Sequence, residues 1–493
     1  MNFIEGTPRE QLVLFSDKLD TIIGEDHVIR FIDLFVEKLN LSTLNIQVND
    51  KVQGTGYNPT LYLKIYIYSY LNKIRSSRKI ENECKRNIEL IWLTKQLSPD
   101  HWSISNFRKN NSKALINIFK EFLKLCYKLK LVNLDLVSVD GTKMRAQNSV
   151  SNVYKRESID GLLKKIEIKI EAYLKELEAN DEKEYDEYEF LTENISEKVE
   201  KLKKHKNKLE IIKNVFDENP EIERIFANDE DSRFQKDNGR NIVGYNCQSA
   251  VDGKNKLIVE AEVTNKNNDI QQLSEMTEKI ENTKAELGET DKSIVVADAG
   301  YHSEIEIMKN IGKENIDIYV PHPTDSNNEK SIKTRDKKKV PFEGYKIDDF
   351  KYNREENIFI CPENKVLKQK GGKHFFYGIN RIAYRCRECS DCRNRNKCTS
   401  NKKGRTITVG ENFYEVQEFR KKMNSELGKK ILNKRKELSE HPFGTIKRNF
   451  GFTYFMQKGL DNAKAEFSFI AFIYNLKRVI NIMGVKGLIR AIN

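Results

Sequence analysis

The chain has 493 residues, with 86 Lys or Arg, 74 Asp or Glu and a formal net charge of +12. A chain of that length is too long for one simple core, so we expect a central domain with other domains attached or inserted. The excess of basic residues favours a polyanionic partner. No basic segment followed by an apolar core opens the sequence, which argues against a signal peptide. The most apolar stretch, 467–483, is broken by Asn475, Lys477 and Arg478. We therefore expect an amphipathic helix there, no membrane span, and a cytoplasmic protein.

Residues 1–130 predict a helical N-terminal domain. Asn58 and Pro59 supply a cap and a first-turn proline for one of its helices. A later helix carries Arg108 and Lys109 on a basic face. Short helices joined by polar turns are typical of a helix-turn-helix that enters the major groove of DNA. A helical bundle packed beside the core fits the same pattern.

A β-branched apolar run at 134–140 predicts a strand that ends in a carboxylate, Asp140. Asp140-Gly141 is also a common hairpin-turn pair, but no partner strand follows at once. Two long apolar seams of helical spacing follow instead, separated by an acidic stretch, over about 155–225. We expect an antiparallel helical hairpin inserted after the first strand. It would serve as a dimer contact, a DNA-facing arm or a structural spacer.

A second carboxylate, Asp298, follows the buried apolar run 293–297. Ser303 and Glu306 form a capping box for the next helix. A carboxylate between a buried strand and a helix lies at the edge of the sheet, where the sites of α/β folds lie. Further strands are expected at 242–251, 256–264 and 316–320. We interpret Asp252 as a residue of the tight turn between the first two of these, and Asp269 as a helix cap, and assign neither to the site.

A third carboxylate, Glu440, lies on a predicted helix near the C-terminus. Pro442 should begin or kink that helix, so we expect Glu440 in its first turn. Two strand-end aspartates and a helical glutamate can converge to hold Mg²⁺, as phosphodiester chemistry on nucleic acid requires. Lys447 shares a helical face with Glu440, where it would contact phosphate; a solvated face is the alternative. Four cations flank Glu440 in sequence: Arg435, Lys436, Lys447 and Arg448.

The expected elements run strand, two hairpin strands, helix, strand, helix, strand, and then the helix that carries Glu440. This is the order of a ribonuclease-H-like α/β core, with a mixed five-stranded sheet and helices. One insertion follows its first strand and another its last. We assign the first part of the core to 131–321, the second insertion to 322–434, and the C-terminal helices that complete the core to 435–493.

The second insertion holds five of the eight cysteines, and it is also rich in Lys and Arg. In a reducing compartment this cluster favours a tetrahedral Zn²⁺ site, for which four thiolates suffice; reduced thiols without metal are the alternative. The basic residues suit a surface for the DNA backbone or a solvated face. Cys84, Cys126 and Cys247 stand alone and are expected to be small buried hydrophobes. The clustered cysteines are Cys361, Cys386, Cys389, Cys392 and Cys398.

Three motifs carry a family resemblance: Val-Asp-Gly-Thr at 139–142, Ala-Asp-Ala-Gly-Tyr at 297–301, and Glu-His-Pro-Phe-Gly-Thr-Ile-Lys-Arg at 440–448. Together with Gly-Tyr-Asn-x-Gln at 244–248, the cysteine cluster and the ending at 474–478, they resemble the DDE transposases of bacterial insertion sequences. The closest branch is the eleven-eighty-two family. The similarity spans nearly the whole chain.

The resemblance implies that Asp140, Asp298 and Glu440 form a catalytic triad that holds two Mg²⁺ or Mn²⁺ ions, about 3.5–4 Å apart, for phosphoryl transfer. It implies double-stranded DNA as the partner, both terminal inverted repeats and target DNA, and a homodimer in the active complex. Lys447 fills the basic position seven residues after the glutamate, and Arg435 and Lys436 compete for the arginine position before it. The cations expected to contact DNA are Lys447, Arg448, Arg435, Lys436, Arg108 and Lys109.

Two other functions fit the same sequence. An inactive or domesticated relative would bind DNA as a regulator, although the presence of all three carboxylates argues against it. A structure-specific nuclease of the same fold would cleave without strand transfer. Inverted repeats that flank the gene would distinguish a mobile element from either alternative.

Overall fold

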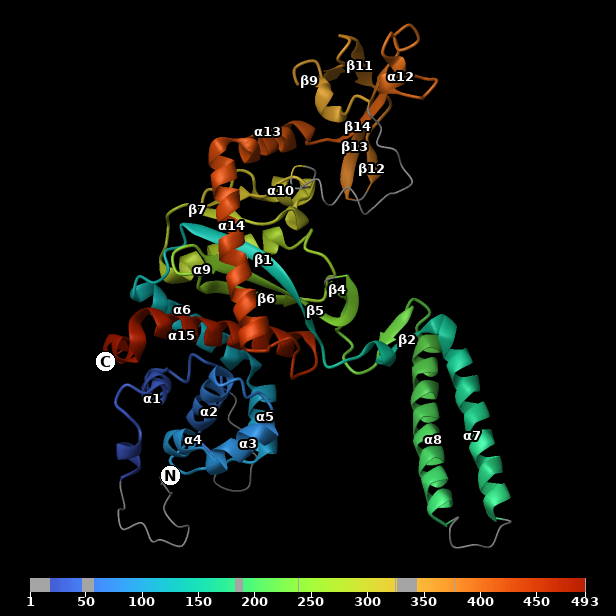
Figure 1. The fold of residues 1–493 in the computed structure, drawn as a ribbon. Coiled ribbons are helices and arrows are strands. Elements are labelled where there is room, and N and C mark those ends of the chain that lie inside the picture. The colour runs from blue at the N-terminus through green and yellow to red at the C-terminus, as the bar shows by residue number, and fades with distance from the viewer. Residues whose placement is uncertain are drawn as a thin grey trace, which may run out of the picture.

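The computed structural model describes residues 18–46, 57–181, 189–237, 239–323, 325, 344–376 and 378–492. Figure 1 shows a central sheet covered by helices, a helical hairpin that projects from one side, and a smaller sheet at the end opposite the N-terminal helices. The expectation about a signal peptide concerns residues outside the described ones.

The central sheet has the strand order β4-β5-β1-β7-β8, with β6 also paired to β5. β5 is antiparallel to β1, β4 and β6, whereas β7 is parallel to β1 and β8 is parallel to β7. The five predicted strands are confirmed. β4 was not predicted, because its sequence, Arg-Phe-Gln-Lys-Asp, lacks an apolar alternation. The strands are β1 (Leu136–Arg145), β4 (Arg233–Asp237), β5 (Arg240–Asp252), β6 (Ile258–Thr264), β7 (Ser293–Val296) and β8 (Ile316–Tyr319).

The predicted end of the first strand at Asp140 is wrong, because β1 continues to Arg145. Its second half stays paired with β5, from Asp140 opposite Ser249 to Arg145 opposite Gly244. The parallel pairing with β7 stops earlier, at residue 138. Asp140 therefore lies inside β1, at the point where one of its two neighbouring strands ends.

The N-terminal helices share one hydrophobic core with the central sheet and the last helix, α15 (Leu460–Ile492). The predicted start of α2 is confirmed, since the Asn58 side chain accepts a hydrogen bond from the Thr60 N–H and Pro59 is the first helical residue. This arrangement is the helical bundle packed beside the core. The helices are α1 (Val28–Lys38), α2 (Pro59–Leu71), α3 (Ser77–Arg86), α4 (Ile88–Leu93), α5 (His101–Asn110) and α6 (Ser112–Lys128).

The stretch expected to be amphipathic is a core helix. Residues 465–476 of α15 are buried on every side, because α1, α2, α6 and β6 surround the helix. α15 is long and apolar enough to cross a membrane by length and composition, and it is the one such helix in the described part of the chain. A buried core helix passes the same test.

A helical hairpin projects from the sheet, formed by α7 (Ile159–Asp181) and α8 (Glu189–Glu218). At its base β2 (Val153–Lys155) pairs antiparallel with β3 (Arg224–Phe226), so the chain leaves and re-enters the core at one place. A small apolar cluster, which includes Phe216, packs the helices at this end. The predicted acidic stretch between the helices lies largely outside the described residues.

The cysteine-rich segment forms a second sheet with its own small core around Phe359, Leu367 and Tyr384. Its strand order is β12-β13-β11-β10-β9, with β14 also paired to β13. The elements are β9 (Lys351–Asn353), β10 (Ile358–Ile360), β11 (Val366–Gln369), β12 (His374–Phe376), β13 (Ile379–Cys386), α12 (Arg395–Cys398) and β14 (Thr406–Gly410).

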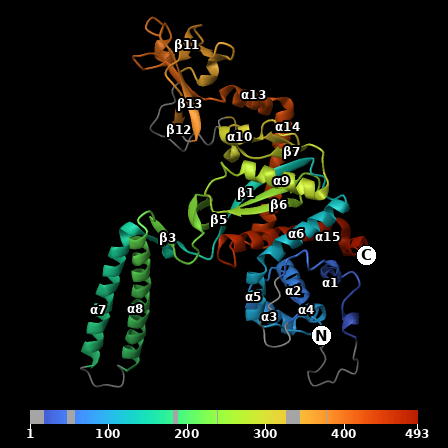
Figure 2. The same cartoon turned by 180° about the vertical axis from the view of Figure 1, so that it is seen from behind.

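Two helices cover opposite faces of the central sheet. α13 (Phe413–Asn424) leads into α14 (Glu426–Gly444), which packs against β1, β5, β7 and β8 (Figure 1). Seen from behind, α9 (Leu273–Leu287) covers the other face (Figure 2). The expectation that Glu440 lies in a first turn is wrong, because Pro442 lies near the C-terminal end of α14. The helix continues past the proline as a π-helical turn, η7 (Thr445–Asn449).

Candidate active site

Asp140 and Asp298 occupy matching positions on adjacent parallel strands. The last parallel pair between β1 and β7 joins Ser138 to Val296, and each aspartate follows two residues later. Strands that run in the same direction carry both carboxylates to the same edge of the sheet. One oxygen of each carboxylate is held by the backbone: the Gly141 N–H donates to Asp140 Oδ1 at 2.8 Å, and the Gly300 N–H donates to Asp298 Oδ1 at 2.8 Å.

The two carboxylates repel each other. Burial, and then the negative charge of Asp298, raises the pKa of Asp140, while the Gly141 N–H, the Ser439 hydroxyl and Arg435 act in the opposite direction. A like charge nearby disfavours the ionised form of a carboxyl group, and a cation bound between the two groups would relieve this repulsion. The hard oxygen donors also fit Mg²⁺ or Mn²⁺.

α14 brings a cation and a hydroxyl to Asp140. Arg435 Nη1 lies 3.7 Å from Asp140 Oδ2, and both side chains are mostly buried. Ser439, one turn later, is buried and donates to the Arg435 carbonyl at 3.1 Å. Glu440 is exposed, about 100° further round the helix than Ser439. Within the described part of the chain, no three His, Cys, Asp or Glu side chains are grouped closely enough to hold a metal ion.

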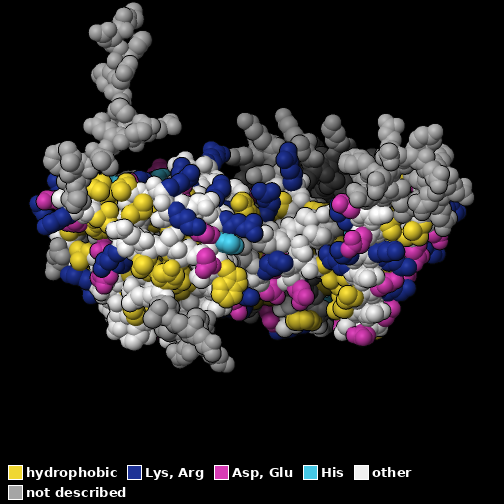
Figure 3. Space-filling model, turned by 90° about the horizontal axis from the view of Figure 1, so that it is seen from below, with side chains coloured by type: hydrophobic (Ala, Val, Ile, Leu, Met, Phe, Trp, Pro, Cys, Tyr) yellow, Lys and Arg dark blue, Asp and Glu magenta, His cyan; other side chains and the backbone are white. Residues whose placement is uncertain are grey.

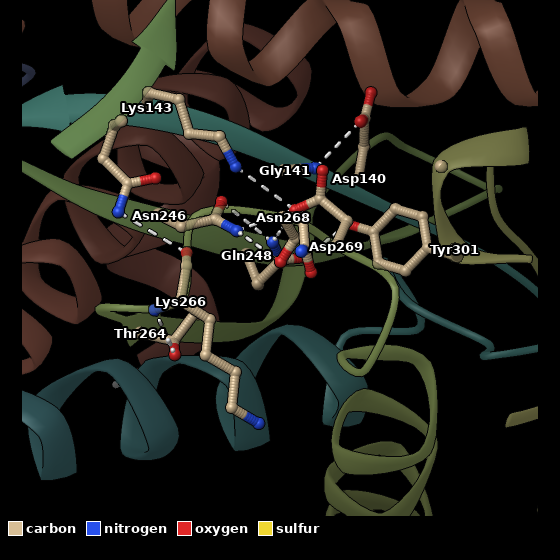
Figure 4. Close-up of polar contacts among 12 residues, drawn as sticks. Asp140, Gly141, Lys143, Asn246, Gln248, Thr264, Lys266, Asn268, Asp269 and Tyr301 are labelled. Atoms are coloured by element: carbon tan, nitrogen blue, oxygen red, sulfur yellow. Dashed lines mark hydrogen bonds and ion pairs between the residues drawn. The ribbon is translucent and has the colours of Figure 1, made fainter. Parts of the chain in front are cut away.

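A polar network lies beside this pair, under Gly141 (Figure 4). Asp269 Oδ1 accepts hydrogen bonds from Asn246 Nδ2 and Gln248 Nε2, both at 2.7 Å, and Lys143 Nζ lies 3.4 Å away. The interpretation of Asp269 as a helix cap is wrong, because α9 begins at Leu273 and the Asp269 side chain turns towards β5 instead.

The expected roles of Asp252 and Ser303 are confirmed: Asp252 accepts from turn N–H groups and Ser303 caps α10 (Glu304–Asn310).

Sequence reasoning missed this network, although a signal was present. Asn246 and Gln248 are two residues apart in the buried part of β5, so both side chains point to one face of the sheet. Both are fully buried. Buried amides need hydrogen-bond partners, so this spacing predicts a polar partner nearby but not its identity. The capping-box prediction was half right, since Glu306 Oε2 accepts from the Ser274 N–H at the start of α9 instead of from Ser303.

The predicted DNA-contacting cations near Glu440 differ in exposure. Arg435 faces Asp140, whereas Lys436 and Arg448 are exposed. Lys447 is half-buried in the π-helical turn, and its positive charge lowers the pKa of the Cys247 thiol, which burial raises by more. Because η7 is π-helical, the α-helical spacing assumed between Glu440 and Lys447 does not hold over its whole length.

Arg108 and Lys109 are adjacent in sequence but differ in environment. The Arg108 guanidinium is buried and donates to the Tyr70 hydroxyl at 3.1 Å and the Arg75 carbonyl at 3.2 Å. It stabilises the packing of α2 against α5 and is not on a surface that DNA could reach. Lys109 is exposed on α5.

Figure 3 shows Lys and Arg side chains gathered on the face seen from below, where the N-terminal helices lie. The exposed cations of α3 and α5 are Arg78, Lys79, Lys85, Arg86 and Lys109.

The five clustered cysteines all line one small cavity at the edge of the second sheet. The Lys365 N–H donates to Cys361 Sγ at 3.2 Å, and the Arg405 N–H donates to Cys389 Sγ at 3.5 Å. Burial, and then the neighbouring thiols, raise the pKa of Cys386 to about 11. The isolated Cys84, Cys126 and Cys247 are buried, as predicted.

Two parts of the chain match transposase families. Residues 360–480 match a family model described as "Transposase DDE domain", and residues 17–110 match one described as "Transposase domain (DUF772)". The first match contains Glu440, Lys447 and the five clustered cysteines, and the second contains α1 to α5. These matches support a DDE transposase and transposase function.

No curated protein matches the chain. One similar solved structure is a piggyBac transposase synaptic complex with hairpin DNA, determined by cryo-electron microscopy. It is 7% identical, and the match covers 95% of this chain and 79% of that one with a TM-score of 0.28. A likeness at that TM-score carries no argument about this chain.

Proposed function

We propose that the chain is a DDE transposase that cleaves DNA at the ends of an insertion sequence and joins the freed ends to target DNA. The observation that carries the proposal is the pair Asp140 and Asp298. Both lie two residues beyond the last β1–β7 pair, and α14 crosses the same edge of the sheet. The transposase matches on either side of this pair support it. The motifs shared with the eleven-eighty-two family make that branch our assignment.

The proposed core is ribonuclease-H-like. Its five strands are β6, β5, β1, β7 and β8, and their order and directions support this assignment: β5 is antiparallel to both β1 and β6, and the last two strands are parallel to β1. We propose four regions: residues 1–130 for DNA binding, 131–321 and 435–493 for the core, and 322–434 as an insertion. The hairpin at about 155–225 is a further insertion.

In this proposal Asp140, Asp298 and Glu440 hold Mg²⁺ or Mn²⁺. Such ions, when bound, lower the pKa of a coordinated water and stabilise charge on the leaving oxygen. Glu440 is exposed and its side chain is long, so we propose that it reaches the site from α14 when DNA and metal are bound.

The chain's own residues orient the reacting groups. Arg435, beside Asp140, would contact the scissile phosphate, and the Ser439 hydroxyl, which donates to the Arg435 carbonyl, lies near the Asp140 carboxylate on the α14 side. Attack by a water oxygen breaks the P–O3′ bond and leaves a 3′-hydroxyl and a 5′-phosphate. That 3′-hydroxyl oxygen then attacks a target phosphate, and the target P–O3′ bond breaks as the new bond forms. Each leaving oxygen takes up a proton.

We propose that the N-terminal helices contact double-stranded DNA through the exposed cations of α3 and α5, with Lys109 among them. The active complex would be a homodimer. The helical hairpin supports the proposed homodimer, because it exposes large apolar side chains on both helices: Ile168, Leu174, Ile211 and Val215. Apolar side chains exposed on a projecting arm are typical of a protein contact surface.

Lys447→Ala is expected to weaken binding of every DNA sequence alike and to lower the slope of log K against log salt concentration by roughly one unit. The reason is that a phosphate contact positions DNA without reading its bases. Cleavage should also slow, because the scissile phosphate would be held less firmly. Arg448→Ala is the matched control and should have a smaller effect. Binding isotherms over a salt series, on an element end and on random DNA, measure both. An unchanged slope with normal cleavage would place Lys447 on a solvated face.

Strand transfer is the reaction that separates a transposase from a nuclease of the same fold. The experiment incubates the full chain and Mg²⁺ with a labelled duplex that ends in the DNA flanking the gene, together with a supercoiled target plasmid. We expect label to become covalently joined to the plasmid. Cleavage without joined product would instead favour the nuclease.

A further inference from the structure

Four separate segments meet in the polar network of Figure 4: strand β1, strand β5, the loop between β6 and α9, and the turn after Asp298. Gly141 on β1 lies directly opposite Gln248 on β5, and Lys143 lies opposite Asn246. Asp269 comes from the loop. The network therefore touches the residue after Asp140 and the turn that begins with Asp298.

The hydrogen bonds of this network form a directed chain. Burial, and then the charges of Asp269, Asp140 and Asp298, raise the pKa of Tyr301 well above its usual value, so its phenol remains protonated. The Tyr301 hydroxyl donates to Gln248 Oε1. That bond fixes which end of the amide points away, and Gln248 Nε2 then donates to Asp269 Oδ1 at 2.7 Å and to Asn246 Oδ1 at 3.0 Å.

Asp269 is the common acceptor of the network. Asn246, Gln248 and Lys143 all point at its Oδ1. The two amide side chains and Tyr301 are fully buried, whereas the Asp269 side chain is 25% exposed. Removing this carboxylate would leave two buried amide N–H groups without their acceptor, and they would have to reorient. Gln248 would then be free to release Tyr301.

Gly141 is the position where this network meets the active strand. A Cβ on Gly141 would lie 2.6 Å from Gln248 Nε2, 3.0 Å from Asp269 Oδ1 and 3.2 Å from the Tyr301 hydroxyl. A side chain is therefore excluded here, and the network packs directly against the backbone that donates to Asp140 Oδ1.

We infer that Asp269 is a positioning residue that, through Gln248 and Tyr301, fixes the turn beginning at Asp298 against the strand that carries Asp140. The inference rests on the proposed catalytic role of these two aspartates. Asp269 sets the separation of the two carboxylates without itself touching the reacting atoms.

The test compares Asp269→Ala, Asp269→Asn and Tyr301→Phe as full-length proteins on one cleavage substrate in Mg²⁺. We expect Asp269→Ala to lower the single-turnover rate at saturating DNA by roughly 10–100-fold, as loss of a residue that orients metal ligands usually does. The DNA dissociation constant should stay within about twofold, because no DNA-facing cation is removed. Asp269→Asn keeps an acceptor oxygen and should recover most of the rate. Tyr301→Phe removes the hydroxyl at the other end of the hydrogen-bonded network and should also lower the rate. The double variant Asp269→Ala/Tyr301→Phe should lose less rate than the two single losses combined.

A matched control is Asp252→Ala, which removes another buried carboxylate that accepts backbone N–H groups but lies in a turn away from the network. It should lower Tm and leave the cleavage rate per folded molecule unchanged. If Asp140→Ala is inactive while Asp269→Ala and Tyr301→Phe both cleave at the wild-type rate, the inference is wrong and the proposed function stands. Should Asp269→Ala fail to fold, a wild-type rate for Tyr301→Phe alone would overturn the inference. If Asp140→Ala itself cleaves normally, the proposed function fails first.

Discussion

Alanine at Asp140, Asp298 or Glu440 is expected to abolish Mg²⁺-dependent cleavage of the element end while the protein still binds that end. Each carboxylate would hold a cation that stabilises transition-state charge by several kcal/mol, so each loss should lower the rate by on the order of 10³-fold. Affinity should change little, because basic residues that contact phosphates provide most of it. Single-turnover cleavage and binding isotherms on the same duplex measure the two effects.

Two controls make this result specific. Glu437→Ala changes another exposed glutamate of α14, one turn before Glu440, and should cleave normally. Asp140→Asn removes the charge that Asp298 repels, so this variant should not have a lower Tm than the wild type without metal. Wild-type cleavage by any one alanine variant in Mg²⁺ would remove that residue from the metal site. Glu440 is the most informative of the three, because it is exposed in this structure.

The second large effect is expected in the cysteine-rich sheet. We propose that Cys386, Cys389 and Cys392, with Cys398 or Cys361, draw together to bind one Zn²⁺ per chain. All five line one cavity, although in the described structure no three of them are close enough to hold a metal ion. Zinc binds the thiolate form, so each ligating thiol releases its proton to solvent, and metal binding would overcome the raised pKa of the Cys386 thiol. Structural zinc contributes roughly 10 kcal/mol or more in small zinc domains, so Cys386→Ser should release zinc and unfold this sheet.

Metal analysis of protein purified without added zinc checks this prediction, with limited proteolysis of residues 344–410 as a second readout. Cys84→Ala is the matched control, since Cys84 is buried among the N-terminal helices and should leave the zinc content unchanged. A folded, metal-free protein with five reduced thiols would show that the cluster is only a packed core of the small sheet.

The strands and helices of the core could be predicted because their sequences repeat with the right period. The runs before Asp140 and Asp298 are β-branched and apolar, and Asn58-Pro59 is a local start signal that no distant contact overrides. α15 was misread because a helix buried on every side tolerates a few polar residues where they find partners. Asn475 is an example, exchanging two hydrogen bonds with the Ile258 backbone of β6.

The site could be predicted only in part. Asp140 and Asp298 could be located because each follows a β-branched apolar run, but the length of β1 beyond Asp140 depends on pairing with β5, which lies about a hundred residues later. The direction of the Asp269 side chain depends on buried amides of another strand. The face of α14 that meets Asp140 depends on how the helix crosses the sheet, and it presents Arg435 and Ser439. Such long-range contacts leave no local periodic signal.

The central claim is metal-dependent cleavage at the ends of a mobile element, and mapping of the cut sites tests it most directly. Purified full-length protein is incubated with the DNA that flanks its gene, with Mg²⁺ or with EDTA, and the 3′ ends of the products are sequenced. We predict 3′-hydroxyl ends at the boundaries of paired inverted repeats in Mg²⁺ and none in EDTA. Intact DNA in Mg²⁺ or Mn²⁺, or cuts scattered without relation to any repeat, would contradict the account.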